Sequence, residues 1–156
     1  MSNAASAGTG PKVALDGEFA FGLQPDRLSN GAGGALRLGF ELDAVVLSLT
    51  PEVGASYHGF AGDVDTTTAF RAFGGARLAF FAVVRPGLYA HAGYAHVGFG
   101  NASSDAATYD GGLFLDFTLL PVLDLGLHGG YTMVAGSTDG PAVHWANAGA
   151  HIAFTF

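Results

Sequence analysis

The chain is dominated by an alternation of apolar and polar residues with a period of two. The alternation occurs in eight stretches, at residues 13–24, 36–43, 47–58, 70–80, 85–94, 113–119, 123–132 and 147–156. In the second stretch, for example, Leu36, Leu38 and Phe40 alternate with Arg37 and Glu41. This period is typical of β-strands whose two faces meet different surroundings. The pattern therefore predicts eight strands and an all-β fold.

The segments between these stretches differ in length in a regular way. Three are tight turns, within residues 43–46, within 81–84 and near 120–121. The other four, at 24–34, 59–67, 98–108 and 135–141, are longer and rich in Gly, Asn, Asp, Ser and Thr, which favour turns and loops. The chain is thus expected to run up and down, with tight turns at one end of an antiparallel sheet and loops at the other.

Charged residues avoid one face of the predicted strands. The sequence has six basic and thirteen acidic residues, which make up 12% of the chain and give a net charge of -7, against about 25% charged residues in an ordinary soluble domain. Eleven of these charged residues are assigned to the polar face of the strands: Asp16, Glu18, Arg37, Glu41, Asp43, Glu52, Arg71, Arg77, Arg85, Asp116 and Asp124. The other eight, Lys12 and Asp110 among them, are assigned to connections or to the chain start, and none to the apolar face.

Alternation alone leaves open which face lies inside a closed barrel. A soluble lipocalin-like carrier of apolar ligands would turn the apolar face inward, whereas a membrane barrel would turn it toward lipid. Five arginines against one lysine favour buried ion pairs, because a guanidinium group binds a carboxylate at two points. Aromatic residues lie near both ends of the apolar face, as in the girdles of membrane barrels. They are Phe40, Phe80, Phe117, Phe154 and Phe156 toward the tight turns, and Tyr57, Phe70, Tyr94 and Tyr131 toward the loops.

The last residues, Phe154-Thr155-Phe156, resemble the C-terminal assembly signal of bacterial outer-membrane barrels. With its strand count and its turns and loops, the chain resembles the OmpA-type transmembrane domain and the OmpX group over nearly its whole length. Eight spanning strands need roughly 80–90 residues, which 156 residues supply. The resemblance implies an eight-stranded antiparallel up-and-down transmembrane β-barrel of a Gram-negative bacterium, with short periplasmic turns and longer extracellular loops.

The first residues of the chain and the same resemblance together predict an organisation and a set of partners. Residues 1–10 read as a remnant of cloning and a disordered tail, without a signal peptide, and residues 11–156 as the barrel. We expect an outer-membrane location, contacts with lipid and lipopolysaccharide, help from the barrel-assembly machinery, and a monomer. The net charge of -7 argues against nucleic acid, which attracts basic surfaces. The absence of cysteine excludes disulfides and thiol chemistry.

The interior of such a barrel is narrow enough for side chains to fill it, so charges there must be paired or hydrogen-bonded. Hydrogen bonding is also the expected role of four inward histidines, because metal ligation needs converging ring nitrogens that spacing across strands does not show. No metal or cofactor is therefore predicted. A plugging network, or alternatively a narrow ion path, is expected from Asp16, Glu18, Arg37, Glu41, Glu52, Arg71, Arg77, Arg85, Asp116 and Asp124, with His58, His91, His128 and His151.

Catalytic motifs are absent from the sequence, including the Gly-x-Ser-x-Gly pattern. Some barrels that this chain resembles modify lipid A with a serine, a histidine and an acid. This chain has two comparable sets of residues, namely Ser103, Ser104 and Asp105 with His96, and Ser137 and Asp139 with His144. Such sets are common by chance in polar loops. We therefore expect a non-enzymatic structural or surface-interaction barrel with a filled core. A small-solute or ion pore and a soluble lipocalin-like carrier are the alternatives.

Overall fold

A computed structural model describes residues 9–23, 28–44, 46–62, 66–80, 84–136 and 142–156. Strands account for nearly all of these residues. No helix in these ranges is long and apolar enough to cross a membrane. The strands are β1 (Gly10–Gly22), β2 (Gly31–Ala44), β3 (Leu47–Phe60), β4 (Thr67–Phe80), β5 (Val84–Phe99), β6 (Ala102–Leu120), β7 (Leu123–Val134) and β8 (Val143–Thr155).

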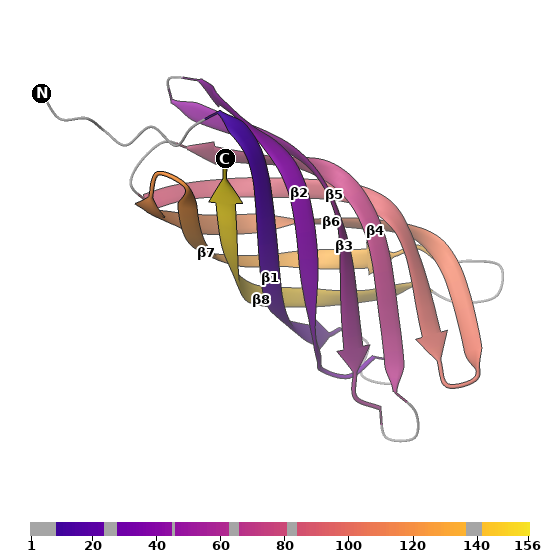
Figure 1. Ribbon diagram of the computed structural model, residues 1–156. Helices are drawn as coiled ribbons and strands as arrows, with labels where there is room; N and C mark the ends of the chain where they lie inside the picture. The colour runs from indigo at the N-terminus through magenta and orange to yellow at the C-terminus, as the bar shows by residue number, and fades with distance from the viewer. Residues whose placement is uncertain (1–8, 24–27, 45, 63–65, 81–83, 137–141) are drawn as a thin grey trace, which may run out of the picture.

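The eight strands form one closed antiparallel barrel (Figure 1). Each strand pairs with its neighbour in sequence, and β1 closes the barrel against β8 in a register that places Val13 opposite Phe154 and Gly22 opposite Trp145. Closure removes the free strand edges that would otherwise leave backbone groups without partners in lipid. The predicted up-and-down eight-stranded fold is confirmed.

The connections at one end of the barrel are as tight as predicted, since β2 ends at Ala44 and β3 begins at Leu47, and β6 ends at Leu120 and β7 begins at Leu123. The prediction of a long loop at 98–108 is wrong. There β5 and β6 pair as far as Phe99 and Ala102, and a two-residue turn follows in which Gly100 has a φ of 57°. The segment is polar, but its cross-strand pairs with β5 continue beyond the end of β7, whose pairing with β6 stops at Thr108 and Val134.

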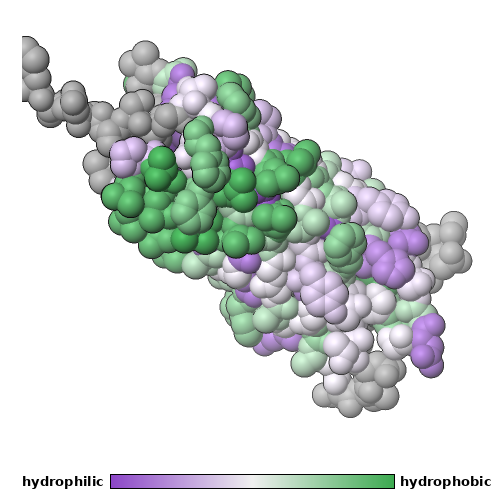
Figure 2. Space-filling model, viewed as in Figure 1, coloured by the Kyte–Doolittle hydropathy of each residue, from purple (hydrophilic) through white to green (hydrophobic). Residues whose placement is uncertain are grey.

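The outer face of the barrel is apolar. Leu15, Leu113 and Leu127 are 56%, 69% and 56% exposed, and Figure 2 shows apolar side chains gathered over the half of the visible face nearer the tight turns. All nine aromatic residues expected in the two girdles lie on this outer face, and Tyr109 joins them. The arrangement is the reverse of that in a lipocalin-like carrier, whose apolar face lines the inside.

Leu36 provides a test of the lipid-facing surface, because it lies midway along β2 between Leu15 and Ala55. Replacing Leu36 with arginine is expected to lower the free energy of unfolding from lipid vesicles by about 2–4 kcal/mol, since a guanidinium group would enter the hydrocarbon. The same change at Val46, in a tight turn, should cost about 0–1 kcal/mol. Denaturant unfolding in vesicles measures both, and equal losses would contradict the assignment.

Candidate functional site: the barrel interior

The barrel interior gathers nearly all of the charged side chains in the described chain. The ten acidic and basic residues predicted to form a network all point inward, and none of their side chains is more than 10% exposed. Two more belong there, Lys12 and Asp110, which the sequence placed in connections. That placement is wrong. Lys12 lies on the polar face of β1, just before the first apolar residue of the alternation. Asp110 lies in β6 between the predicted loop at 98–108 and the alternating stretch at 113–119.

Near the tight turns, two basic and two acidic side chains form a compact group, here called the turn-end cluster. Lys12 Nζ lies 2.6 Å from Glu41 Oε2 and 2.8 Å from Asp124 Oδ2. Arg85 lies 2.5 Å from Glu41 and 3.6 Å from Asp124 through its two terminal nitrogens. Each acid therefore contacts both bases, and the group links β1, β2, β5 and β7 across this end of the barrel.

At mid-height, Arg37 connects two carboxylates. Its Nε and Nη2 atoms donate to the two oxygens of Asp16, each at 2.8 Å, and Nη1 donates to both oxygens of Glu52 at 2.9 and 3.2 Å. Glu52 also contacts His91 Nε2 at 2.8 Å. A guanidinium group that binds a carboxylate at two points fixes its orientation as well as its charge, so strands β1, β2, β3 and β5 are tied together here.

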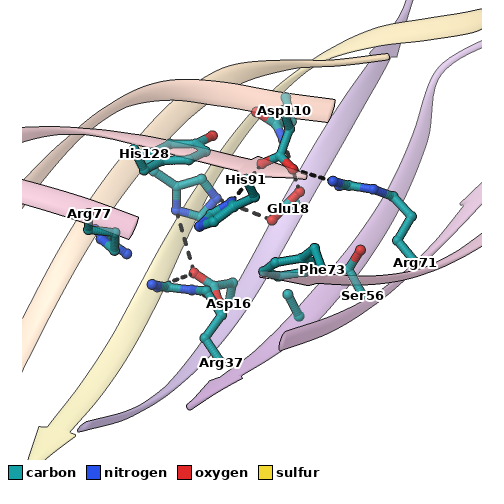
Figure 3. A pocket seen from close by; sticks show the side chains of 13 residues that line it. Asp16, Glu18, Arg37, Ser56, Arg71, Phe73, Arg77, His91, Asp110 and His128 are labelled. Atoms are coloured by element: carbon teal, nitrogen blue, oxygen red, sulfur yellow. Dashed lines mark hydrogen bonds and ion pairs between the residues drawn. The ribbon is translucent and has the colours of Figure 1, made fainter. Parts of the chain in front are cut away.

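The chain of contacts continues from His91 toward the loop end. His91 Nδ1 lies 3.0 Å from Asp110 Oδ2, and Asp110 pairs in turn with Arg71, as Figure 3 shows. Arg71 Nε also donates to the Thr108 hydroxyl at 3.0 Å. An uninterrupted series of ion pairs and hydrogen bonds therefore runs across the barrel from Asp16 to Arg71.

Aromatic rings fill the space beside these charges. Arg77 stacks over the ring of Phe114 at 3.8 Å from its centroid and contacts Asp116 at 3.5 Å. Tyr89 stacks on His91 with 5.2 Å between ring centroids. A cavity of ≈ 30 Å³ remains between the central side chains (Figure 3), room for about two water molecules. Little continuous water can therefore pass through this layer.

Two histidines of neighbouring strands face one another beside this cavity. His128 on β7 and His151 on β8 place their Nδ1 atoms 3.3 Å apart. Both Nδ1 atoms lie near Asp16 Oδ1, at 3.8 Å for His128 and 3.9 Å for His151. The Nε2 atoms turn the other way, toward Asp116 at 2.9 Å for His151 and toward Glu18 at 3.5 Å for His128.

The glycines of the polar face make room for these rings. A methyl group added at Gly126 would lie 2.3 Å from His151 Cε1 and 2.4 Å from Asp116 Oδ1, and one added at Gly149 would lie 2.8 Å from His128 Nε2. Such distances are shorter than ordinary van der Waals contact, since carbon atoms prefer about 3.5–4.0 Å. Glycine at these two positions therefore permits the close packing of the histidine pair.

The loop end of the interior is closed by an apolar group, here called the apolar cap. Trp145 is fully buried and packs edge-on against Phe60 at 5.2 Å and against His58 at 5.7 Å between ring centroids. Trp145 points inward because it shares the inward parity of His151 along β8. The buried members of the cap are Ala20, Leu28, Phe60, Ala69, Ala95, Val97, Ala106, Val134, Val143 and Trp145.

His58, the fourth inward histidine, joins the cap to the charged layer. Its Nε2 lies 2.9 Å from Glu18 Oε2, which also accepts a hydrogen bond of 3.2 Å from the Asn147 amide. Its ring is fully buried. The structure therefore brings all four predicted histidines into the interior, each beside a carboxylate.

The serine, histidine and acid sets considered for catalysis lie elsewhere. His96 and Asp105 pair at 2.7 Å on the outer face of the β5–β6 hairpin, with both side chains about half exposed. Among the described side chains, no hydrogen bond links Ser103 to His96. Ser137 and Asp139 lie outside the described residues, and His144 packs against the ring of Tyr131 at 5.9 Å.

Solved structures with the same architecture are bacterial outer-membrane proteins. Neisserial surface protein A superposes with a TM-score of 0.80 at 15% identity, over 95% of this chain and 98% of that one. The outer-membrane enzyme PagL gives 0.65 at 16% identity over 88% and 97%, and a major outer membrane protein from Thermus thermophilus gives 0.59 at 14% over 94% and 99%. No family model matches the sequence, and no curated protein matches it.

These similarities extend over nearly the whole chain in each case. At identities of 14–16% they establish the fold alone. The chain has the fold of the eight-stranded outer-membrane β-barrels, as the resemblance of its sequence implied. The set includes an enzyme, so the shared architecture does not by itself distinguish a catalytic barrel from a non-catalytic one.

Proposed function

We propose that the protein is an integral outer-membrane β-barrel with a closed interior and a non-catalytic role, either structural or in contacts at the cell surface. The outer-membrane location is supported by the apolar outer face and by the solved structures that share the fold. We propose that the barrel is a monomer. Its proposed partners are lipid and lipopolysaccharide in the membrane, and the barrel-assembly machinery during biogenesis.

The observation that carries this proposal is the filling of the lumen in three successive layers. The turn-end cluster occupies one end, the paired side chains around Arg37 and His91 occupy the middle, and the apolar cap occupies the loop end. Conduction would need a continuous water path, and apolar constrictions oppose one by dewetting. The charged lumen favours a small-solute or ion pore as the second candidate, because rings of charged side chains select ions in channels.

Planar-bilayer recording separates the two candidates. The purified barrel, inserted from detergent into a lipid bilayer, is expected to give no steady single-channel steps, because three packed layers obstruct the lumen. A membrane extract without the protein, and a known porin, serve as the negative and positive controls. Reproducible steps of one amplitude, proportional in number to the protein added, would favour the pore and contradict the closed interior.

The non-catalytic part of the proposal is supported by the placement of the described nucleophile candidates. The outward His96–Asp105 pair is about half exposed, whereas catalytic groups act best where water is excluded. The interior histidines are held by carboxylates and are not accompanied there by a hydroxyl nucleophile in hydrogen-bond contact, within the described residues.

A further inference from the structure

We propose that Asp16, His128 and His151 form a binding site for one divalent transition-metal ion, of which Zn²⁺ is the best match, inside the barrel wall. The three side chains come from adjacent strands β1, β7 and β8, and each offers one ligand atom within 4.8 Å of the other two. The site lies on the two strands that close the barrel and on their neighbour β7. The proposal goes beyond the function proposed above and does not depend on it.

The spacing of the three atoms fits a metal ion. His128 Nδ1, His151 Nδ1 and Asp16 Oδ1 are separated by 3.3, 3.8 and 3.9 Å. A point equidistant from three atoms so spaced lies about 2.1 Å from each, which matches zinc–nitrogen and zinc–carboxylate distances of about 2.0–2.2 Å. Two imidazole nitrogens with one carboxylate oxygen are ligands that zinc, copper and nickel accept.

A carboxylate lies beside the outer nitrogen of each ring, at the place of the supporting group in a metal site. A metal-bound histidine usually donates its other ring N–H to a carboxylate, which fixes the tautomer. Here His151 Nε2 lies 2.9 Å from Asp116, and His128 Nε2 lies 3.5 Å from Glu18. With a proton on each Nε2 atom, the two Nδ1 atoms, 3.3 Å apart, would present lone pairs to the same space, and a cation bound there would relieve their repulsion. Without a cation, one ring holds its proton on Nδ1 and donates it to the Nδ1 atom of the other ring.

The charge and space around the site favour a cation with further ligands. The inward side chains of the described chain include five basic groups and eight acidic ones, Asp43 among them, so the interior carries a negative excess that a divalent ion would reduce. Arg37 donates to Asp16 at 2.8 Å but leaves lone pairs on the carboxylate free. The cavity lined by Asp16 and His128 has room for about two waters, which would complete the coordination.

Zinc uptake by the folded protein tests the proposal. Protein without a histidine tag, refolded in detergent and freed of metal with a chelator, is titrated with zinc chloride against a chromophoric competitor, and its metal content is measured after removal of free ions. We expect one zinc per chain and a rise in the unfolding temperature. Absence of stoichiometric zinc uptake overturns the proposal. It is also overturned if the histidine pair stabilises the barrel in a pH-dependent manner that zinc does not change, because a proton shared by the two rings, and not a metal ion, would then hold the pair together.

Variants locate the site. His128→Gln and His151→Gln are each expected to weaken zinc binding by more than about 100-fold, and Asp116→Asn by about 10–100-fold, the loss typical of a supporting carboxylate. His96→Gln is the matched control, since His96 also pairs with an aspartate but on the outer face, and it should bind zinc as the original chain does. Equal binding by all four variants overturns the proposal, and if the glutamine variants fail to refold, the titration of the unaltered protein decides alone.

Discussion

Replacing Arg37 with alanine is expected to lower the free energy of unfolding by about 3–5 kcal/mol, the usual cost of leaving buried charges without a partner. Arg37 is the partner shared by Asp16 and Glu52, and the side chains of both acids are only 4% exposed. Water cannot replace the lost contacts without entering the packed middle of the barrel. Because the single tryptophan, Trp145, is fully buried, its fluorescence can follow urea unfolding in vesicles.

The matched control for Arg37→Ala is Asp105→Ala, which breaks the outward ion pair with His96. That pair is about half exposed, and exposed pairs contribute about 0–1 kcal/mol. A large loss at Arg37 with a small one at Asp105 is the expected result. Losses of similar size at the two positions would mean that the interior charges are solvated, and the picture of a plugged core would fail.

Trp145→Ala is expected to lower the free energy of unfolding by about 3–5 kcal/mol, the range for removing a large buried aromatic side chain. The apolar cap would lose its largest member, along with ring contacts to Phe60 and His58. The remaining cap residues extend from rigid strands, so the cavity should collapse only in part. Gel migration of heated and unheated samples, over a series of temperatures, measures the change without relying on tryptophan fluorescence.

Trp145→Phe is the conservative control, because it keeps a ring in the cap, and its loss should be markedly smaller than that of the alanine variant. Should alanine and phenylalanine be equally stable, the cap would contribute nothing through packing. Should both lose as much as Arg37→Ala, the full size of the indole, rather than the presence of a ring, would be what matters, because the indole nitrogen has no hydrogen-bond partner among the described residues.

Strand number and strand faces follow from the sequence because the period of two is local. Leu36 and Arg37 differ in polarity whatever lies across the barrel, so their opposite directions can be predicted without knowing their neighbours. Prediction of strands from the sequence fails where the composition of a segment and its periodicity disagree. The Ser- and Thr-rich start of β6 has the composition of a loop, and only its pairing with β5 makes it a strand.

The meeting of side chains from distant strands could not be predicted in the same way. His128 and His151 share the polar face in the sequence, but their approach to Asp16 depends on the register of β7, β8 and β1, which closure of the barrel sets. The interior position of Lys12 is hidden for a related reason, since its partners Glu41 and Asp124 become neighbours only in the closed barrel. The apolar cap could likewise not be predicted without knowing that β8 begins at Val143, because only then does the alternation that turns His151 inward also turn Trp145 inward, close to the loop end.

The pairing of β1 with the far end of the chain has a consequence for how the barrel is assembled. Lys12 pairs with Asp124, which lies 112 residues further along the chain, and Glu18 accepts a hydrogen bond from Asn147, which lies 129 residues further along. A sheet of the first few strands would hold these charges at an open edge facing hydrocarbon, where unpaired groups cost several kcal/mol each. Partial insertion is therefore penalised until β8 arrives, so we expect the strands to enter the bilayer and close in one cooperative event rather than hairpin by hairpin.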